Sequence, residues 1–474
     1  MPKGIELYST ESKRLVDRID HSSSITYVAW SHDGKTIAGV DDFLNIGVWN
    51  RANKTLGTLL DGATNAGVKV AFHPTRPLLI ASDWDRMRIW DWTDGKLLFS
   101  GPVPLLATQV SPDGNQLGAS LENDNSVLEL HLDESPILHA LSIPMATSND
   151  YVGQIIECPW DPLGRTWAFS TPSGTIFWNI ADDLPLAKLL SPALTGCRFD
   201  NSNQLWTTGS MGIRRWKVGE SQGSTEPIRL GPPQKVGWDG AALVYFPQFS
   251  ADRQTMGFNI ATAAFLVSTD APTQSRVFAP TPRANFLALH ESWLVTADLR
   301  RDEVTVWDLA TDRPLAKLPI NATAAYFSPD HRWLLTVHKT NALWRTDNWQ
   351  LVRSWSPGGG PAAFCPTTSH LAISNRFGVI TIVEPESGRE VVQLESPASE
   401  LVKAIAFSAD GSKLLYASGE CHTVFYWDLA AIRPELEKID LDVDPSLQGV
   451  KPVARRDEIP IQTITVDTGP EWPR

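Results

Sequence analysis

The sequence predicts an all-β protein, a β-propeller of repeated four-stranded blades, and three observations support this fold class. First, tryptophan recurs at a nearly fixed step, and Trp49 and Trp90 lie 41 positions apart. Second, each such tryptophan lies near the end of a short strand-like run, such as Glu303–Asp308. Third, turn sequences recur at a common offset before these tryptophans. A period of about 40 residues with several strands per unit is typical of β-propellers.

The tryptophan position continues through the chain, and other residues take it in some repeats. Its tryptophans are Trp49, Trp90, Trp178, Trp216, Trp307, Trp344 and Trp427, and the gaps are filled in register by Tyr8, His131, Ser268 and Val383. Because burial of aromatic side chains dominates core energetics, we expect Trp90, Trp178, Trp307 and Trp427 to lie between neighbouring blades rather than to stack on a ligand.

The last repeat defines the unit most clearly. Its first strand is expected over Val402–Phe407, its turn over 408–411, its second strand over 413–418 and its third over 423–428. In the turn, Asp410 can bond the backbone and Gly411 can adopt positive φ. Similar turns occur at 31–34, 111–114 and 328–331. An aromatic or large apolar residue precedes each turn, and these residues are Trp30, Phe72, Val110, Trp160, Phe199, Phe249, Phe327, Phe364 and Phe407.

The two ends depart from this unit. Residues 4–9 are expected to form a third strand and residues 14–19 a fourth, with no inner strands before them. The sequence contains about eleven third strands but only ten first–second pairs. Either residues 14–19 close a ring against the last blade near 423–428, or the chain is part of a longer product. After the last blade, the spacing of apolar residues predicts a helix over 429–441, split or kinked at Pro434, and then a short strand over 461–467.

Two stretches resemble a WD40 repeat: 406–411 closing in Tyr426-Trp427-Asp428, and 21–34. The resemblance covers roughly residues 4–430 and implies a hydrogen-bonded tetrad of His, Ser or Thr, Asp and Trp. The tetrad His is present only at His21, and the turn Asp is displaced or missing, so apolar packing must supply most of the stability. The positions equivalent to His21 are Ala63, Gly101, Tyr151, Leu190, Leu318 and Ala398, and Cys421 stands at the turn position of the last repeat.

The pattern is also similar to the degenerate WD40 regions of large bacterial proteins, which often carry a Ser/Thr kinase domain. No kinase motif is present in this sequence. Longer spacing at 141–153 divides the chain into N-terminal blades at 1–142, a set of seven blades at 150–430, and a tail at 431–474. The competing arrangement is one ring of about ten blades. We prefer the division because seven units are the usual WD40 ring.

Net charge, cysteine usage and the lack of long apolar runs limit the partners and the location that the sequence predicts. The net charge of −13 disfavours nonspecific binding to nucleic acid or to an anionic membrane. The four cysteines, Cys158, Cys197, Cys365 and Cys421, form no CxxC pair, and we expect buried thiols in a reducing compartment. No signal peptide and no apolar run of membrane-spanning length is visible. The expected location is therefore cytoplasmic.

No motif predicts a catalytic, cofactor-binding or metal-binding residue, so we expect none of these and no cofactor. Adjacent Cys421 and His422 suit joint ligation poorly. The segments 208–212 and 358–360 lack the context of a nucleophile elbow or a phosphate loop. The acidic pairs 41–42 and 182–183 are expected to be solvated turn residues rather than cation sites.

The sequence therefore predicts a noncatalytic protein–protein interaction scaffold or regulatory module. Loops on a rigid propeller suit binding, and the partners are expected to be other proteins of unknown identity. The alternative is a propeller enzyme, such as a lactonase-like hydrolase or a quinone-dependent dehydrogenase. That class needs acidic residues and His or Asn converging on a central metal or cofactor, and the sequence shows no repeated set of them.

Overall fold

The computed structural model divides into two compact units, which are described separately. Unit 1 comprises Met1–Ser135 with Ser396–Ser399, and unit 2 comprises Pro136–Glu395 with Glu400–Arg474. The structure describes residues 3–43, 45–60, 68–82, 87–101, 105–121, 127–132, 137–141, 143, 151–159, 161, 164–191, 193–219, 227–236, 245–250, 252–260, 263–271, 275–278, 285–298, 302–356, 358–375, 378–395, 401–418, 423–437 and 464–470.

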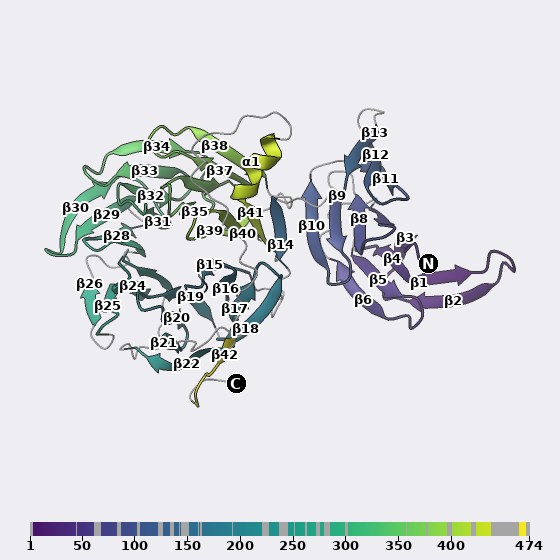
Figure 1. Cartoon of the computed structure of the whole chain (residues 1–474), viewed down its shortest axis with the longest axis horizontal. Coiled ribbons are helices and arrows are strands. Elements are labelled where there is room, and N and C mark those ends of the chain that lie inside the picture. Colours follow the sequence, from purple (N-terminus) through teal and green to yellow (C-terminus); the bar gives the residue numbers. More distant parts are fainter. Residues whose placement is uncertain are drawn as a thin grey trace. The chain divides into compact units, whose positions relative to one another are not determined.

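The all-β prediction is confirmed (Figure 1). The described strands form eleven sheets, of which eight are four-stranded. Every pairing is antiparallel apart from β22 with β42. Among the described residues, α1 (Leu429–Glu437) is the one helix, and Asp428 caps it by accepting hydrogen bonds from the backbone N–H of Ala430 and Ala431, both at 3.1 Å. The helix begins where the sequence predicted, and residues 438–441 of the prediction lie outside the described residues.

Unit 1 contains four sheets. They are β1 (Gly4–Tyr8) and β2 (Leu15–Asp20); β3 (Ile25–Trp30), β4 (Thr36–Asp41), β5 (Ile46–Asn50) and β6 (Leu56–Leu60); β7 (Lys69–Phe72), β8 (Leu78–Ser82), β9 (Met87–Asp91) and β10 (Lys96–Gly101); and β11 (Leu105–Val110), β12 (Gln116–Leu121) and β13 (Val127–His131). Strands β1 and β2 of the first sheet correspond to the third and fourth strands of a blade, as the sequence predicted.

Unit 2 contains seven sheets. They are β15 (Gln154–Glu157), β16 (Thr166–Thr171), β17 (Gly174–Asn179) and β18 (Leu184–Leu190); β19 (Leu194–Phe199), β20 (Leu205–Gly209), β21 (Gly212–Val218), β22 (Ile228–Lys235) and β42 (Ile464–Val466); β23 (Tyr245–Phe249), β24 (Thr255–Ile260), β25 (Ala263–Ser268) and β26 (Ser275–Phe278); β27 (Asn285–Leu289), β28 (Trp293–Asp298), β29 (Glu303–Asp308) and β30 (Arg313–Leu318); β31 (Ala324–Phe327), β32 (Trp333–Val337), β33 (Asn341–Arg345) and β34 (Leu351–Trp355); β35 (Ala362–Phe364), β36 (Leu371–Ser374), β37 (Val379–Val383) and β38 (Glu390–Glu395); and β14 (Leu138–Leu141), β41 (Val424–Asp428), β40 (Lys413–Ser418) and β39 (Val402–Phe407).

The seven sheets of unit 2 form a closed ring (Figure 1). Each innermost strand contacts that of the next sheet, in the order β15, β19, β23, β27, β31, β35 and β39, and β39 contacts β15 again. Strand β14 completes the last sheet by pairing with β41, with Leu138 opposite Trp427 and Leu141 opposite Val424. Strand β14 lies within the predicted segment 1–142. The alternative in which residues 14–19 close the ring is wrong, because β2 pairs with β1 and β14 takes that place beside β41.

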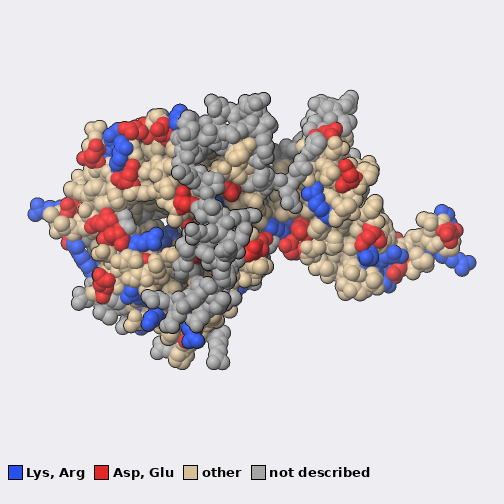
Figure 2. Space-filling view, viewed as in Figure 1, with Lys and Arg blue, Asp and Glu red and all other residues tan. Residues whose placement is uncertain are grey.

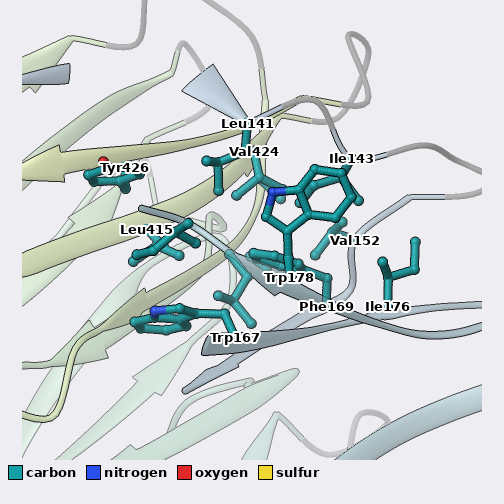
Figure 3. Packing of buried hydrophobic residues seen from close by; sticks show 14 residues of the cluster. Leu141, Ile143, Val152, Trp167, Phe169, Ile176, Trp178, Leu415, Val424 and Tyr426 are labelled. Carbon is teal, nitrogen blue, oxygen red and sulfur yellow. The ribbon is translucent and has the colours of Figure 1, made fainter. Parts of the chain in front are cut away.

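A shared hydrophobic cluster holds the closure (Figure 3). Leu141 and Val424 from the closing sheet belong to the same buried cluster as Val152, Trp167 and Trp178 at the start of the ring. Leu141 is 1% exposed, so shortening its side chain leaves a cavity in this joint.

The tryptophan positions are buried to different degrees. Trp90 and Trp178 are each 2% exposed, as predicted, whereas Trp307 and Trp427 are only half-buried. The prediction that these side chains are largely buried is therefore confirmed for Trp90 and Trp178, and Trp307 and Trp427 are buried less completely.

The recurring turns use the bonds that their sequence predicted. Ser31 Oγ donates to Asp33 Oδ1 at 2.8 Å and accepts from the backbone N–H of Thr36 at 2.9 Å. Gly34 has φ of 68°, a left-handed conformation that glycine adopts without strain. His331 occupies the equivalent position of a later turn with φ of 59°.

Candidate functional site

Three members of the tetrad expected from His21, namely His21, Asp41 and Trp49, lie together in unit 1. His21 Nε2 lies 3.5 Å from Asp41 Oδ2, and the His21 ring meets the Trp49 ring edge-on at a centroid distance of 5.4 Å. Burial alone would raise the pKa of Asp41, but hydrogen bonds from Asn45, Phe43 and His21 outweigh it and lower that pKa. Asp41 is 4% exposed, so the expectation that it is a solvated turn residue is wrong. Its position at the end of β4, just before the turn, was the available signal.

Other tryptophans keep part of this arrangement. Trp216 Nε1 donates to Thr207 Oγ1 at 2.9 Å, and Trp344 Nε1 donates to Thr336 Oγ1 at 3.0 Å. These pairs join the third strand of a sheet to its second strand. They satisfy indole donors in the core and thereby act as structural bonds.

The acidic pair at 182–183 is also structural. Asp183 Oδ1 accepts a hydrogen bond from Trp178 Nε1 at 3.0 Å, and Asp182 Oδ2 accepts one from Asn179 Nδ2 at 2.6 Å. Both carboxylates therefore hold the end of β17 in place.

Three side chains in unit 2 could hold a metal ion by proximity alone, namely His290, Glu291 and His331. His290 Nε2 lies 2.9 Å from His331 Nδ1 and 3.0 Å from Glu291 Oε2. Separations near 3 Å suit either hydrogen bonds or ligands around one small ion.

The other ring nitrogen of His290 favours hydrogen bonding. His290 Nδ1 accepts the backbone N–H of Ser292 at 3.2 Å, so the proton of the neutral ring lies on Nε2, which then donates to its neighbours. A metal needs an unprotonated Nε2. His73 in unit 1 makes the same kind of link between sheets, with Nε2 at 2.7 Å from the carbonyl oxygen of Gly114. The His290 cluster therefore matches a contact that recurs between neighbouring sheets.

A central cavity of about 460 Å³ lies in the ring of unit 2. Figure 2 shows a hollow in this unit with Lys or Arg atoms beside it. The lining comes mainly from the innermost strands of six sheets, and also from the end of β16 and the turn that follows it. Its polar members include Gln154, Arg198, Gln248, Tyr326 and Lys403. The other four lie 44 to 249 positions after Gln154 and belong to different blades, so no local sequence pattern could have gathered them.

Unit 1 carries an exposed apolar surface on β3. Tyr27, Val28 and Trp30 are 39%, 44% and 45% exposed. The guanidinium of Arg51 lies over the Trp30 ring at 5.5 Å. In the sequence, Trp30 occupies the large apolar position before a turn, which is typical of a core residue, so the local pattern does not predict this surface.

The remaining candidates have structural explanations. Residues 208–212 form the turn between β20 and β21, and residues 358–360 link β34 to β35, both as predicted. Cys158, Cys197 and Cys365 are buried free thiols, and burial raises the pKa of Cys158 and of Cys197. Cys421 and His422 lie outside the described residues. In the part of the chain that the structure describes, no helix is both long and apolar enough to cross a membrane.

Comparison with known protein families agrees with the grouping of His21, Asp41 and Trp49 in unit 1. Residues 13–46 match the family model described as WD domain, G-beta repeat. The matched segment contains both His21 and Asp41, the pair that the structure brings together. No curated protein matches the chain. The WD40 resemblance is thus confirmed for this repeat, and the four-stranded antiparallel sheets elsewhere fit the blades of such a propeller.

Proposed function

We propose that this chain is a noncatalytic module that binds other proteins through surfaces held on rigid sheets. The observation that carries the proposal is the exposure of β3. The innermost strands β19 and β39 in unit 2 are largely buried, whereas the same repeat position in unit 1 exposes Tyr27, Val28 and Trp30. The innermost strand is core in unit 2 but surface in unit 1, so β3 is a candidate for a surface that a partner covers.

The neighbouring sheet explains why β3 is exposed. The sheet of β1 and β2 has no strands of the first and second positions. Ile5 and Ile19 from that sheet pack against Ile37 and Trp49 on β4 and β5. Among the described residues, β3 therefore has an innermost strand, β7, on one side, and none on the side of β1 and β2. Contiguous apolar surface with aromatic residues is characteristic of protein interfaces.

Net charge and cysteine usage support the proposal that the partners are proteins in a reducing compartment. The net charge of −13 supports protein partners rather than nucleic acid or anionic membrane surfaces. The three described cysteines are thiols, which supports a reducing compartment such as the cytoplasm.

Quantitative affinity capture from the source cells tests the proposal. The bait proteins are the wild type, a Tyr27→Ser/Trp30→Ser variant, and a Leu184→Ser/Leu190→Ser control, which removes two side chains that are each 56% exposed on β18. We expect a defined set of proteins that the control retains and the β3 variant loses. Hydrogen exchange with a recovered partner should then show added protection at 25–30. Capture profiles that are identical for all three baits would overturn the proposal.

A further inference from the structure

The central cavity of unit 2 is lined by positive charge, although the protein as a whole is negatively charged. Among the described residues that line it, two are cationic, Arg198 and Lys403, and none is Asp or Glu. The chain as a whole carries −13. A cavity with low-dielectric walls and one sign of charge concentrates ions of the opposite sign. The polarity of the cavity is therefore opposite to that of the molecule.

The bonds of Arg198 leave much of its guanidinium unused. Its Nη1 donates to Gln154 Oε1 at 3.3 Å and to the carbonyl oxygen of Cys197 at 3.2 Å. Among the described residues, no carboxylate lies within ion-pair distance of it. A guanidinium has five N–H donors in a planar fork that matches the two oxygens of a carboxylate or phosphate. The remaining donors are thus available to a ligand.

The surroundings of Arg198 make its charge costly without a counterion. Burial is the main cause that lowers the pKa of Arg198, and the positive charge of Arg253 acts in the same direction. Arginine nevertheless remains protonated in proteins. Arg198 is half-buried in the wall of the cavity, so its charge is only partly hydrated, and an anion beside it would stabilise the ring.

Tyr326 adds a second donor from a different sheet. Arg198 lies on β19 and Tyr326 on β31, and the two interact electrostatically in the same cavity. Burial raises the pKa of Tyr326, so its hydroxyl keeps its proton at neutral pH. Among the described residues, that hydroxyl has no hydrogen-bond partner. Lys403, at the start of β39, adds a second positive charge, and its Nζ lies 5.9 Å from the centroid of the Tyr151 ring.

We propose that the central cavity of unit 2 is a binding site for a small anion bearing a carboxylate or phosphate group. The Arg198 guanidinium binds the oxyanion through paired N–H groups, the Tyr326 hydroxyl donates a further hydrogen bond, and Lys403 attracts the ligand. A volume of about 460 Å³ is in the range of small-molecule sites and suits a metabolite-sized ligand. This site is independent of the β3 surface, because it lies in the other unit.

Isothermal titration of the full-length protein tests the proposal with three probes: inorganic phosphate, succinate and, as a neutral control, glycerol. We expect saturable binding of phosphate or succinate that weakens with ionic strength, and no binding of glycerol. The preference between phosphate and succinate distinguishes a phosphate ligand from a carboxylate ligand. A wild-type protein that binds neither anion up to about 10 mM, the weak limit of specific affinity, would overturn the proposal.

Matched variants locate the binding. Arg198→Gln should weaken binding about tenfold or more, which corresponds to about 1.4 kcal/mol, and Tyr326→Phe should weaken it several-fold. Arg229→Gln is the control, because it removes one positive charge from an exposed side chain on β22, outside the cavity. Equal affinities in Arg198→Gln and Arg229→Gln would show nonspecific binding and overturn the assignment.

Thermal unfolding separates a binding defect from a folding defect. Without anion, Arg198→Met should unfold at the same temperature as the wild type or higher, because it removes a partly desolvated charge that has no carboxylate partner among the described residues. With saturating anion, only the wild type should gain stability. A wild-type gain that Arg198→Met shares would contradict the proposal. So would the finding that an acidic peptide binds the cavity while both small anions fail to bind.

Discussion

At the scale of single residues, Asp41 links three parts of one repeat. Its carboxylate accepts the backbone N–H of Phe43 at 2.9 Å and of Asn45 at 2.8 Å and lies beside His21. Removing the charge weakens several hydrogen bonds to a buried acceptor. Asp41→Asn should therefore cost about 1.5–3 kcal/mol, as for hydrogen bonds to charged groups.

Hydrogen exchange over 36–50 measures this loss, and Asp42→Asn, at an exposed neighbouring position, is the control.

The lowered pKa of Asp41 also determines how stability depends on pH. A carboxyl whose pKa falls on folding contributes stability above its unfolded pKa of about 3.9, and this stability disappears as the pH falls through the folded value. An Asp41→Asn protein with unchanged protection would show that the Asp41 carboxylate is not important for stability.

A buried histidine gives unit 1 a second pH dependence. His73 is 4% exposed, its Nδ1 accepts the backbone N–H of Thr75 and Arg76, and its pKa is lowered mainly by burial. The neutral ring is thus favoured on folding. Its contribution is complete above the unfolded pKa of about 6.5 and is lost as the pH falls through the folded pKa.

We therefore expect unit 1 to lose protection of 69–82 against hydrogen exchange when the pH drops from about 7.5 to 5.5, after correction for the intrinsic exchange rates. His73→Gln should be less stable at neutral pH but should depend less on pH. His32→Gln, at an exposed position, should behave as the wild type. A variant His73→Gln with the full wild-type pH dependence would assign the effect to another group.

At the scale of elements, the closing strand β14 decides whether unit 2 is a ring. Leu141 is 1% exposed and pairs with Val424. Leu141→Ala should cost about 2–5 kcal/mol, as for other leucines cut to alanine in a core. Leu184→Ala, on the exposed face of β18, should cost less than about 0.5 kcal/mol. Chemical denaturation gives both values, and hydrogen exchange at 424–428 shows whether the loss is at the joint. Equal costs for the two variants would show that β14 does not hold the ring.

The elements also show what a sequence can predict. The turns, the strand positions and the half-complete first sheet follow from local periodicity, and the structure has them where they were expected. The pairing of β14 with β41 joins segments nearly 290 residues apart, and the backbone N–H of Ala409 donates to Glu157 Oε2 at 2.5 Å across a separation of 252 residues. Neither contact leaves a local signal. The same holds for the central cavity, whose members come from separate sheets.

At the scale of the whole molecule, the two units should differ in stability. In repeat proteins, stability is close to a sum of the stabilities of the repeats and of the interfaces between neighbours. Each sheet of unit 2 has neighbours on both sides because the ring is closed. In unit 1, β3 is exposed and the first sheet has only two strands. Unit 1 therefore gains less apolar burial per sheet.

We expect unit 1 to unfold at a lower denaturant concentration than unit 2. Hydrogen exchange with mass spectrometry in rising urea measures this directly, because peptides from 25–60 and from 324–395 report the two units separately. Leu141→Ala should lower the midpoint of the second set of peptides and leave that of the first unchanged. Asp41→Asn should do the reverse. A single transition shared by all peptides, shifted equally by both variants, would show that the chain unfolds as one cooperative body.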